Sequence, residues 1–518
     1  MRITYLGHAG FCVETEQSIV VADPWLSSQG AFDGAWFQFP RNHHMAGWLQ
    51  QKLSGSPKRR FIYISHEHKD HFDLAFLKSL ACRNFTLVIP KFRRAALRQA
   101  LADYACEGMR VLQHEEAFPL PDGEVRLFVD DSELNRDSAL LIRADGQAFL
   151  NLNDCKLYDS MTHIREAYGP IDVFACQFSG ATWHPTCYDY TREEYERVSA
   201  LKRKAKFETV ARAIDSLRPR HYLPSAGPAC FLDPHLMQLN FERDNIFPFA
   251  PRFLEFLGQR LPNSGTSWRN WMPGDSLDLG VPGSFTEAPL RVGAHNFVPY
   301  IHRYASDYAG YFAHLHRTFT AREIRAYQRR LRDCLHEKLR RLSLRQRVPV
   351  PLYFGFMDAP LPMLRVDFGR DRVDAVNSMS EENFHSIVAP AWQVARVLDG
   401  MITWEDFALT FRMRLNRSPD LYQALIQGFL IMEAEDLEWF CAKVLGLERL
   451  RSRTIVEANG SRYRIDRFCP HQGGDLAAGW ADGACWTCPR HRWQFNLEKE
   501  GKCTTSDCSI NAVCLEPE

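Results

Sequence analysis

Several features that would narrow the class of this protein are missing from its 518 residues. Lysine plus arginine and aspartate plus glutamate both number 63, so no excess of one charge points to nucleic acid or to a membrane surface. The chain has no uninterrupted apolar run long enough to span a membrane, no internal repeat and no low-complexity segment. We therefore expect a soluble globular protein with neither a nucleic-acid partner nor a membrane partner.

A secretory leader is not apparent either. The first residues, MRITYLGHAGFCVET, alternate like a β-strand instead of showing a basic start followed by an apolar stretch. Fifteen cysteines is a high number, but they are scattered through a large chain and not concentrated in a small secreted scaffold. The expected location is cytoplasmic, with most cysteines as buried thiols.

The length favours about three domains, because one domain averages about 150 residues. Over residues 1–285, short apolar runs alternate with segments of helical spacing, which predicts an α/β layer structure. Residues 286–445 are more helical with a few strands and predict a mixed α+β domain. Residues 446–518 return to a β pattern. The predicted fold class is therefore α/β multidomain with a small all-β domain at the end.

Three local signals support this organisation. Asn459-Gly460 between two alternating segments predicts a tight hairpin, and the ADG sequence at 144–146 predicts a second one. Residues 321–347 show helical spacing, with one apolar face and ten arginines or lysines around the others. The favoured interpretation of those charges is a solvated surface. The alternative is a docking face for an anionic substrate or an acidic electron-transfer protein.

The C-terminal part contains cysteine and histidine pairs at ligand spacing. Cys469 and His471 form a C-x-H pair, and Cys488 and His491 form a C-x-x-H pair, with sixteen residues between the two pairs. Two cysteines on one iron and two histidines on the other make up a Rieske [2Fe–2S] cluster. Zinc can accept the same residue types, but zinc-finger spacings usually place the cysteines together. We therefore predict a Rieske cluster on these four residues.

The N-terminal part contains a second concentration of ligand-type residues. The apolar strand FIYIS is followed by HEHKDH, residues 66–71. Residues two apart on an extended segment point the same way, so His66 and His68 can bind one metal ion while Asp70 and His71 bind a second. This H-x-H-x-D-H pattern resembles the metallo-β-lactamase superfamily, which implies an αββα sandwich. The resemblance also implies a bridging carboxylate after a later strand, where the sequence LNLNDCK supplies Asp154.

This sequence departs from the hydrolases of that superfamily in two places. They add a histidine from an intermediate strand, but the corresponding stretch VRLFVDDSELNRDS contains none and offers acids instead. Glu133 best matches the expected position by its distance from Asp154, and Asp131 is the alternative. Near the end of the domain, Ala226 stands where such hydrolases keep their last histidine; His235 or His184 are the possible substitutes.

The resulting ligand set favours iron over zinc, because added oxygen donors suit a harder ion and zinc has no redox chemistry for a Rieske cluster to feed. The expected metal ligands are three imidazoles and three carboxylates: His66, His68, His71, Asp70, Glu133 and Asp154.

Longer segments resemble the CMP-N-acetylneuraminate hydroxylase family in the same order, including DPWLSSQGAFDGAWF, LRPRHYLPSAGP and GMITWEDFALTFRMRLNRSPDLYQAL. The similarity covers most of residues 1–440. That family carries its Rieske domain at the N-terminus, whereas here it is C-terminal. The cluster must then reach the iron by another route or from another subunit of a homo-oligomer. An acid at Glu133 also resembles the diiron β-hydroxylases of antibiotic assembly, which share the lactamase fold.

The resemblance implies an O2-dependent monooxygenase with non-haem iron, as one or preferably two ions. It places His66, His68 and Glu133 on one iron, Asp70 and His71 on the other, and Asp154 between them, with Glu133 and Asp154 as the catalytic residues. Electrons would come from NAD(P)H through a separate reductase and a ferredoxin or cytochrome b5-like carrier, because no G-x-G-x-x-G follows a strand here.

The substrate stays open at this point. The first hypothesis is a polar metabolite such as an N-acyl sugar nucleotide. The second keeps the oxygenase but assigns it a specialised, amino-acid-derived substrate. The third is of another class: a zinc hydrolase whose Rieske domain senses redox state.

Overall fold

The computed structural model describes residues 1–132, 135–180, 182–281, 283–450 and 452–515. They form two compact units. The first comprises the described residues within 1–131, 135–181 and 196–309, and the second those within 132–134, 182–195 and 310–518. The domain boundaries expected near residues 285 and 445 stay predictions.

Two sheets form the first unit. In spatial order, the eight-stranded sheet contains β15 (Phe285–Thr286), β14 (Ser276–Asp278), β1 (Arg2–Gly7), β2 (Gly10–Glu14), β3 (Ser18–Ala22), β4 (Arg59–Tyr63), β5 (Thr86–Pro90) and β6 (Gly108–Leu112). The seven-stranded sheet contains β13 (Ser267–Trp268), β12 (His221–Ser225), β11 (Val173–Gln177), β10 (Gln147–Asn151), β9 (Asn135–Ala144), β8 (Gly123–Ser132) and β7 (Ala117–Leu120).

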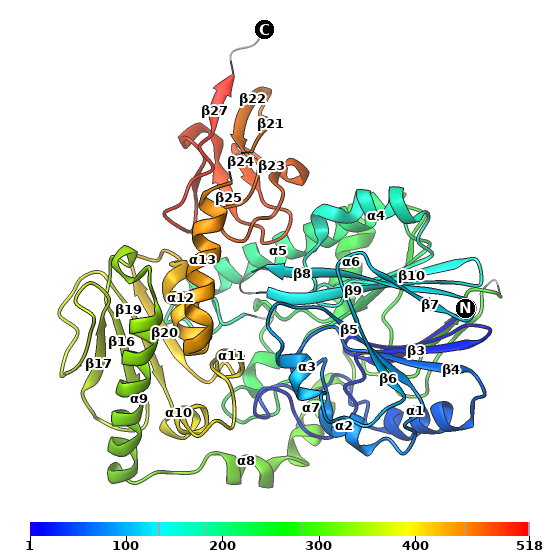
Figure 1. Cartoon of the computed structure of the whole chain (residues 1–518), viewed down its shortest axis with the longest axis horizontal. Coiled ribbons are helices and arrows are strands. Elements are labelled where there is room, and N and C mark those ends of the chain that lie inside the picture. The colour runs from blue at the N-terminus through cyan, green and yellow to red at the C-terminus, as the bar shows by residue number, and fades with distance from the viewer. Residues whose placement is uncertain (133–134, 181, 282, 451, 516–518) are drawn as a thin grey trace. The chain divides into compact units, whose positions relative to one another are not determined.

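Helices cover the outer faces of both sheets (Figure 1). The helices of this part of the chain are α1 (His44–Gly55), α2 (Leu74–Ser79), α3 (Ala96–Ala100), α4 (Met161–Tyr168), α5 (Arg192–Leu217), α6 (Ala250–Arg260) and α7 (Phe297–Ser306), after which α8 (Ala309–Leu315) follows. Buried residues of α1 and α2 pack against the eight-stranded sheet. Buried residues of α4, α5 and α6 pack against the other sheet.

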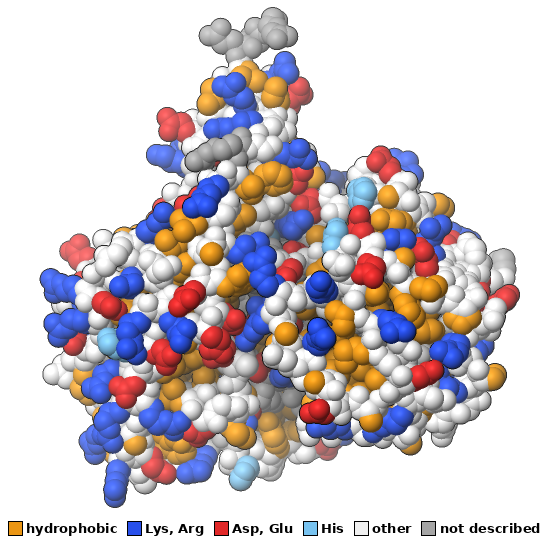
Figure 2. Space-filling view, viewed as in Figure 1, with side chains coloured by type: hydrophobic (Ala, Val, Ile, Leu, Met, Phe, Trp, Pro, Cys, Tyr) orange, Lys and Arg blue, Asp and Glu red, His pale blue; other side chains and the backbone are white. Residues whose placement is uncertain are grey.

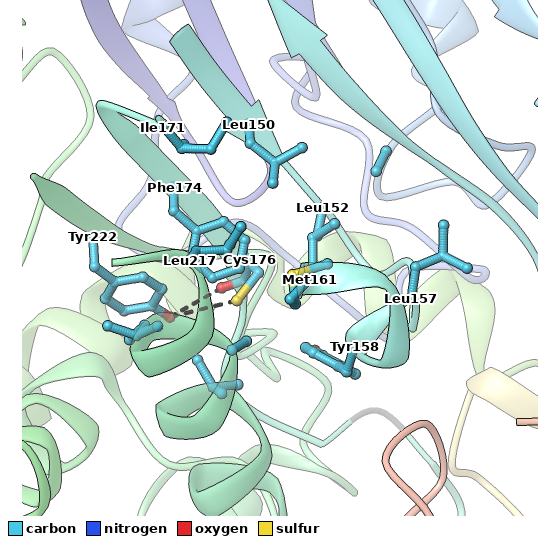
Figure 3. Packing of buried hydrophobic residues seen from close by; sticks show 14 of the residues in the cluster. Leu150, Leu152, Leu157, Tyr158, Met161, Ile171, Phe174, Cys176, Leu217 and Tyr222 are labelled. Carbon is cyan, nitrogen blue, oxygen red and sulfur yellow. Dashed lines mark hydrogen bonds between the residues drawn. The ribbon is translucent and has the colours of Figure 1, made fainter. Parts of the chain in front are cut away.

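Apolar side chains fill three layers of this unit. The continuous apolar runs of the central strands are buried on both faces, as expected for strands inside a layered sheet. Between the sheets, the ring of Phe11 meets that of Phe149 with centroids 5.3 Å apart. Figure 3 shows the layer beneath the second sheet, where Phe174, Cys176 and Tyr222 face Met161 and neighbouring helical residues. The predicted αββα sandwich is confirmed.

The strand directions bring several strand ends to one edge of this sandwich. β3 and β4 are parallel, and so are β10, β11 and β12. β9 is antiparallel to β10, so β9 begins at the edge where β10 ends. The Ser138 hydroxyl at the start of β9 donates to the Ser65 carbonyl oxygen beyond β4, at 2.8 Å. This hydrogen bond links the two sheets at the edge where the polar residues of the sequence motif lie.

The second unit contains a five-stranded sheet. Its strands in spatial order are β18 (Arg372–Val376), β17 (Met363–Asp367), β16 (Leu352–Phe356), β19 (Phe384–Ala389) and β20 (Arg414–Ser418). The helices of this unit are α9 (Ala321–Arg341), α10 (Ala391–Leu398), α11 (Trp404–Leu409), α12 (Ala424–Ile431) and α13 (Leu437–Glu448). A capping box of Thr320 and Glu323 starts α9, in which the apolar residues Ile324, Leu331 and Leu335 are buried.

Two small sheets complete the second unit and form its all-β part. One contains β21 (Arg453–Ala458), β22 (Ser461–Asp466) and β27 (Val513–Leu515); the other contains β23 (Trp480–Asp482), β24 (Cys485–Thr487), β25 (Gln494–Asn496) and β26 (Lys502–Cys503). Asn459 and Gly460 join β21 to β22 with φ of 50° and 74°, as a two-residue turn with two positive φ angles requires. The predicted hairpin is confirmed, as is the one at Asp145-Gly146 between β9 and β10.

Charged side chains of both signs are interspersed on the face in Figure 2, in keeping with a formal net charge of zero. Among the described residues, none of the helices combines the length and apolar character needed to cross a membrane.

Candidate functional site

The segment after β4 places the histidine motif at the edge of the sandwich. His66, Asp70 and His71 are all buried, with 2% or less of each residue exposed. A tight turn follows, in which the backbone N–H groups of His71 and Phe72 both donate to the His68 carbonyl oxygen. His66 Nε2 and His68 Nδ1 lie 2.9 Å apart. Two imidazole nitrogens about 2.1 Å from one metal ion can adopt this separation.

His71 is held by a carboxylate on one side of its ring and faces two carboxylates on the other. Its Nδ1 lies 2.8 Å from Asp23 Oδ2. Its Nε2 is buried and lies 3.7 Å from both Asp70 Oδ2 and Asp154 Oδ2, and it has no hydrogen-bond partner among the residues that the structure describes. A carboxylate behind a histidine typically orients the other ring nitrogen toward a metal. The residues present therefore fit a metal ion between His71 and the two acids.

The charges of this cluster depend on one another. Burial acts to raise the pKa of Asp154, but the interaction with His71 outweighs it and leaves this pKa below its usual value. Burial acts to lower the pKa of His71, but the neighbouring Asp70 and Asp154 raise it well above its usual value. In this group of side chains, the ionised carboxylates of Asp70 and Asp154 are therefore favoured when a positive charge lies between them. A bound metal ion would provide that charge.

Asp154 reaches the site from the second sheet. It follows β10 after Asn153, whose φ of 51° turns the chain sharply. The amide nitrogen of Gln177, at the end of β11, donates to Asp154 Oδ1 at 2.8 Å. One carboxylate oxygen is therefore held by the protein, and Asp154 Oδ2 is the oxygen on the side of His71.

His8 belongs to this cluster, although the sequence motif did not reveal it. It directly follows β1 with a φ of 52°, and its Nε2 lies 3.0 Å from Asp70 Oδ2. His8, Asp70 and His71 have ligand-type atoms within 4.8 Å of one another, as have His66, His71 and Asp154. The available signal was a histidine and a glycine immediately after an apolar strand.

Asp137 was also missed. It lies near the start of β9, and its Oδ1 is 3.2 Å from Nδ1 of His66. Burial, followed by repulsion from Asp154, raises the pKa of Asp137 well above its usual value. The sequence predicts a single strand for the stretch that contains Asp137, but the stretch contains the end of β8 and the start of β9, which are neighbouring strands of one sheet. Asp137 therefore lies near the start of β9, at the site edge.

The same stretch contains Glu133 and Asp131, the two acids that the sequence offered as metal ligands. Glu133 lies outside the described residues, so its assignment as a ligand stays a prediction. Asp131 accepts a hydrogen bond from the Arg93 backbone N–H at 2.7 Å. Asp131 does not join the ligand groups formed by the residues that the structure describes.

The candidate substitutes for the last histidine lie elsewhere. His184 bonds the Tyr190 hydroxyl within the second unit, at 2.9 Å. The side chain of His235 is 68% exposed. Within the described ranges, neither joins the groups around His71. Ala226 is buried and donates its N–H to the His8 carbonyl oxygen at 2.9 Å, so its segment supports the site without a ligand side chain.

The four predicted cluster ligands come together in the second unit. Cys469 and Cys488 are fully buried, and the rings of His471 and His491 lie 4.7 Å apart. Each cysteine opens a tight loop, whose backbone N–H groups at Gly473 and Arg492 donate back to the cysteine carbonyl oxygens. These loops fit a [2Fe–2S] cluster held by two thiolates and two imidazoles.

Neighbouring residues pack tightly against the predicted cluster ligands. A Cβ on Gly474 would lie 3.1 Å from Cys488 Sγ, so a larger residue would require the cysteine loop to shift by a few tenths of an ångström. Trp493 stacks on the His471 ring with centroids 4.2 Å apart, and Tyr422 meets the same ring edge-on at 5.4 Å. Two aromatic rings therefore pack against the His471 imidazole, which is half-buried.

Comparison with known families matches two parts of the chain. Residues 2–224 match the model of the beta-lactamase superfamily domain. Residues 429–514 match the Rieske [2Fe-2S] domain. The chain joins a β-lactamase superfamily domain to a Rieske domain. The Rieske domain is C-terminal, as the cysteine and histidine spacing predicted.

Curated relatives align with most of the chain. A Rieske 2Fe-2S iron-sulfur protein of Mycolicibacterium smegmatis is 28% identical over 536 residues, covering 98% of each chain. The cytidine monophosphate-N-acetylneuraminic acid hydroxylase of Xenopus laevis is 22% identical over 458 residues, covering 82% of this chain and 70% of its own. Among solved structures, the diiron beta-hydroxylase CmlA of Streptomyces venezuelae is 17% identical with a TM-score of 0.37, covering 54% of each chain. The predicted resemblance to the hydroxylase family is confirmed.

Proposed function

We propose that this protein is a Rieske-fed non-haem iron monooxygenase, with a diiron site, that hydroxylates a polar metabolite. The observation that carries the proposal is the presence, in one chain, of a Rieske domain and a buried cluster of imidazoles and carboxylates with ligand geometry. A Rieske cluster transfers electrons singly, whereas hydrolysis at a zinc site transfers none. A redox-active metal in the β-lactamase superfamily domain gives both parts a function.

The chain's own residues supply the framework of such a site. His66 and His68 would hold one iron, Asp70 and His71 the other, and Asp154 would lie between them, with Glu133 as a further oxygen donor. Iron at this site would activate dioxygen with electrons from the [2Fe–2S] cluster. That cluster would be held by Cys469, His471, Cys488 and His491.

Buried acids behind the imidazoles would keep the ligands in place. Asp23 lies behind His71, and Asp137 lies behind His66, each within 3.2 Å of the ring Nδ1. His8 lies beside Asp70 and limits the directions in which that carboxylate can turn. Because all these groups are buried, bulk water is excluded from the side of the site that faces the sheets.

Electrons would come from NAD(P)H through a separate reductase and a ferredoxin or cytochrome b5-like carrier. The proposed substrate is an N-acyl sugar nucleotide, because the hydroxylase relatives named above align over 82% of this chain. With such a substrate, electron donor and oxygen, the product should be heavier by one oxygen atom, as mass spectrometry would show. An unchanged substrate would favour the specialised, amino-acid-derived class instead.

Metal content tests the proposal before any substrate is known. Anaerobically purified protein should contain about four iron atoms per chain, two in the cluster and two in the β-lactamase-type site. Cys488→Ser should lose the two cluster irons, and Asp154→Ala should lose those of the other site. About two iron atoms per chain together with stoichiometric zinc would overturn the proposal in favour of a zinc hydrolase.

A further inference from the structure

Behind Asp154, on the side away from His71, lies a buried lysine. Lys206 comes from α5 and is only 4% exposed. Its ammonium donates to Gln177 Oε1 at 2.8 Å and to the Tyr158 hydroxyl at 3.1 Å. Gln177 in turn donates from Nε2 to Asp154 Oδ1 at 2.8 Å. A positive charge is thus connected to the candidate metal ligand through one amide.

The chemistry of the groups fixes the direction of these hydrogen bonds. An ammonium group can only donate, so Gln177 must turn its oxygen toward Lys206. The amide nitrogen must then point to Asp154, which as a carboxylate can only accept. The assignment of the oxygen and nitrogen atoms of Gln177, which is ambiguous for an isolated amide, is therefore determined by Lys206.

We infer that Lys206 and Gln177 act as positioning residues that make Asp154 bind metal through Oδ2 alone. Gln177 occupies Oδ1, and Oδ2 is the oxygen 3.7 Å from His71 Nε2. The inference rests on the proposed role of Asp154 as a metal ligand. We call the chain of hydrogen bonds from Lys206 through Gln177 to Asp154 the relay. Without the relay, both oxygens of Asp154 are free to bind metal, and the coordination number of the metal rises.

A buried ammonium is costly to the fold unless it is well hydrogen-bonded. Lys204, two residues earlier on the same helix, is exposed and has no such role. The contrast gives a matched pair: removal of either lysine changes the net charge equally, but only Lys206 is connected to Asp154.

Cobalt binding to the full chain provides the test. Co²⁺ is titrated into protein that retains its Rieske cluster, and the difference spectrum against cobalt-free protein cancels the cluster absorbance. Visible cobalt bands weaken as the coordination number rises. Lys206→Met and Gln177→Leu should bind Co²⁺ about 10- to 100-fold more weakly, as is typical when outer-shell partners of a ligand are removed, and with weaker bands. Lys206→Arg should restore the wild-type spectrum, and Lys204→Met should match the wild type.

The experiment shows whether a negative result contradicts the proposed metal site or only the relay. If the wild type binds no Co²⁺, or Asp154→Ala binds it unchanged, the assigned metal site is wrong. If the wild type binds and Asp154→Ala does not, yet Lys206→Met and Gln177→Leu keep the wild-type affinity and spectrum, the relay is wrong. Should Lys206→Met fail to fold, Gln177→Leu, which is neutral and similar in size, provides the same test.

Discussion

At the scale of single residues, the candidate site depends on the acids behind its histidines. An imidazole has two nitrogens, and a carboxylate at one of them determines which nitrogen faces outward. Asp23 does this for His71, and Asp137 for His66. Lys206 and Gln177 do the equivalent for the carboxylate of Asp154. The ligands are therefore oriented by groups that are themselves buried.

Removal of Asp137 should weaken the site without affecting the Rieske cluster. Asp137 lies 3.2 Å from His66 Nδ1, and Asp137→Ala leaves that nitrogen with the neutral Ser65 hydroxyl at 2.9 Å in place of a carboxylate. Because the ring is then held less firmly, we expect about 10- to 100-fold weaker iron binding. Metal analysis after dialysis measures the loss, and the visible spectrum of the cluster should stay unchanged. Asp131→Ala is the control, since Asp131 bonds the Arg93 backbone. Equal iron content in both variants would contradict the role of Asp137.

Glycine at position 474 should be needed for a full complement of cluster. The Cβ in Gly474→Ala would meet Cys488 Sγ at 3.1 Å and Arg490 Cγ at 3.2 Å, so the cysteine loop must shift. We expect lower visible absorbance of the cluster per chain. Gly446→Ala is the matched control, because a Cβ there meets nothing within 4 Å. Equal absorbance in the two variants would show that the loop tolerates a larger residue.

At the scale of elements, α9 shows how one helix combines an apolar face with a buried charge. Ile324, Leu331 and Leu335 form the buried face, and Lys338 continues it while only 1% exposed. The Lys338 ammonium lies 4.4 Å from the centre of the Trp404 ring. Burial lowers its pKa to about 8. The helix therefore carries a charge that the folded state disfavours.

Stability should depend on pH through Lys338. The folded-state pKa of about 8 lies below the usual 10.5, so the unfolded chain binds more protons between these values and wild-type stability rises with pH there. Lys338→Met removes this dependence. At pH 7 the variant should be more stable by at most about 3 kcal/mol, since each pKa unit corresponds to about 1.4 kcal/mol and the lost cation–π contact offsets part of the gain.

Thermal unfolding midpoints at pH 7 and pH 10 measure this difference, which should shrink at the higher pH. Arg329→Met, on the exposed face of the same helix, should show no such change. A difference between Lys338→Met and wild type that is the same at both pH values would assign the effect to packing alone.

At the scale of the whole molecule, the proposed activity requires electrons to pass from one unit to the other. After anaerobic reduction, the wild-type cluster should regain its oxidised absorbance quickly when mixed with oxygen, because the second metal site consumes its electron. Asp154→Ala should reoxidise on the order of tenfold more slowly. Stopped-flow absorbance measures both rates. Equal reoxidation rates in the wild type and in Asp154→Ala would show that the cluster does not pass its electron to the second metal site. The Rieske domain would then have another role.

The same measurement distinguishes transfer within a chain from transfer between chains. Cys488→Ser should have no cluster but an intact second site, whereas Asp154→Ala should have the reverse. Fast reoxidation in a mixture that forms mixed oligomers would show transfer between subunits. Reoxidation as slow as in Asp154→Ala alone would show transfer within one chain.

Local sequence spacing was sufficient for the motifs whose members are close in the chain. Cys469 and His471 share one loop, Cys488 and His491 share another, and the histidines of residues 66–71 follow a single strand. Covalent geometry limits how far such neighbours can separate, so their meeting could be predicted. The Asn459-Gly460 turn was predictable for the same reason, because its positive φ angles are a local property of those residues.

Only the tertiary structure brought in the partners that are far apart in the sequence. His8, Asp23 and Asp137 come from three different strands or strand ends, which strand order and direction place at one edge. Lys206 comes from helix α5, which packs against the second sheet. The register of β9 against β10, and not the spacing of acids along the chain, turned Asp137 toward His66. Strand pairing and packing are decided by the burial of whole faces, which the residues around a motif do not encode locally. The sequence by itself therefore determined the two kinds of site, and the packed structure decided which side chains hold their ligands in place.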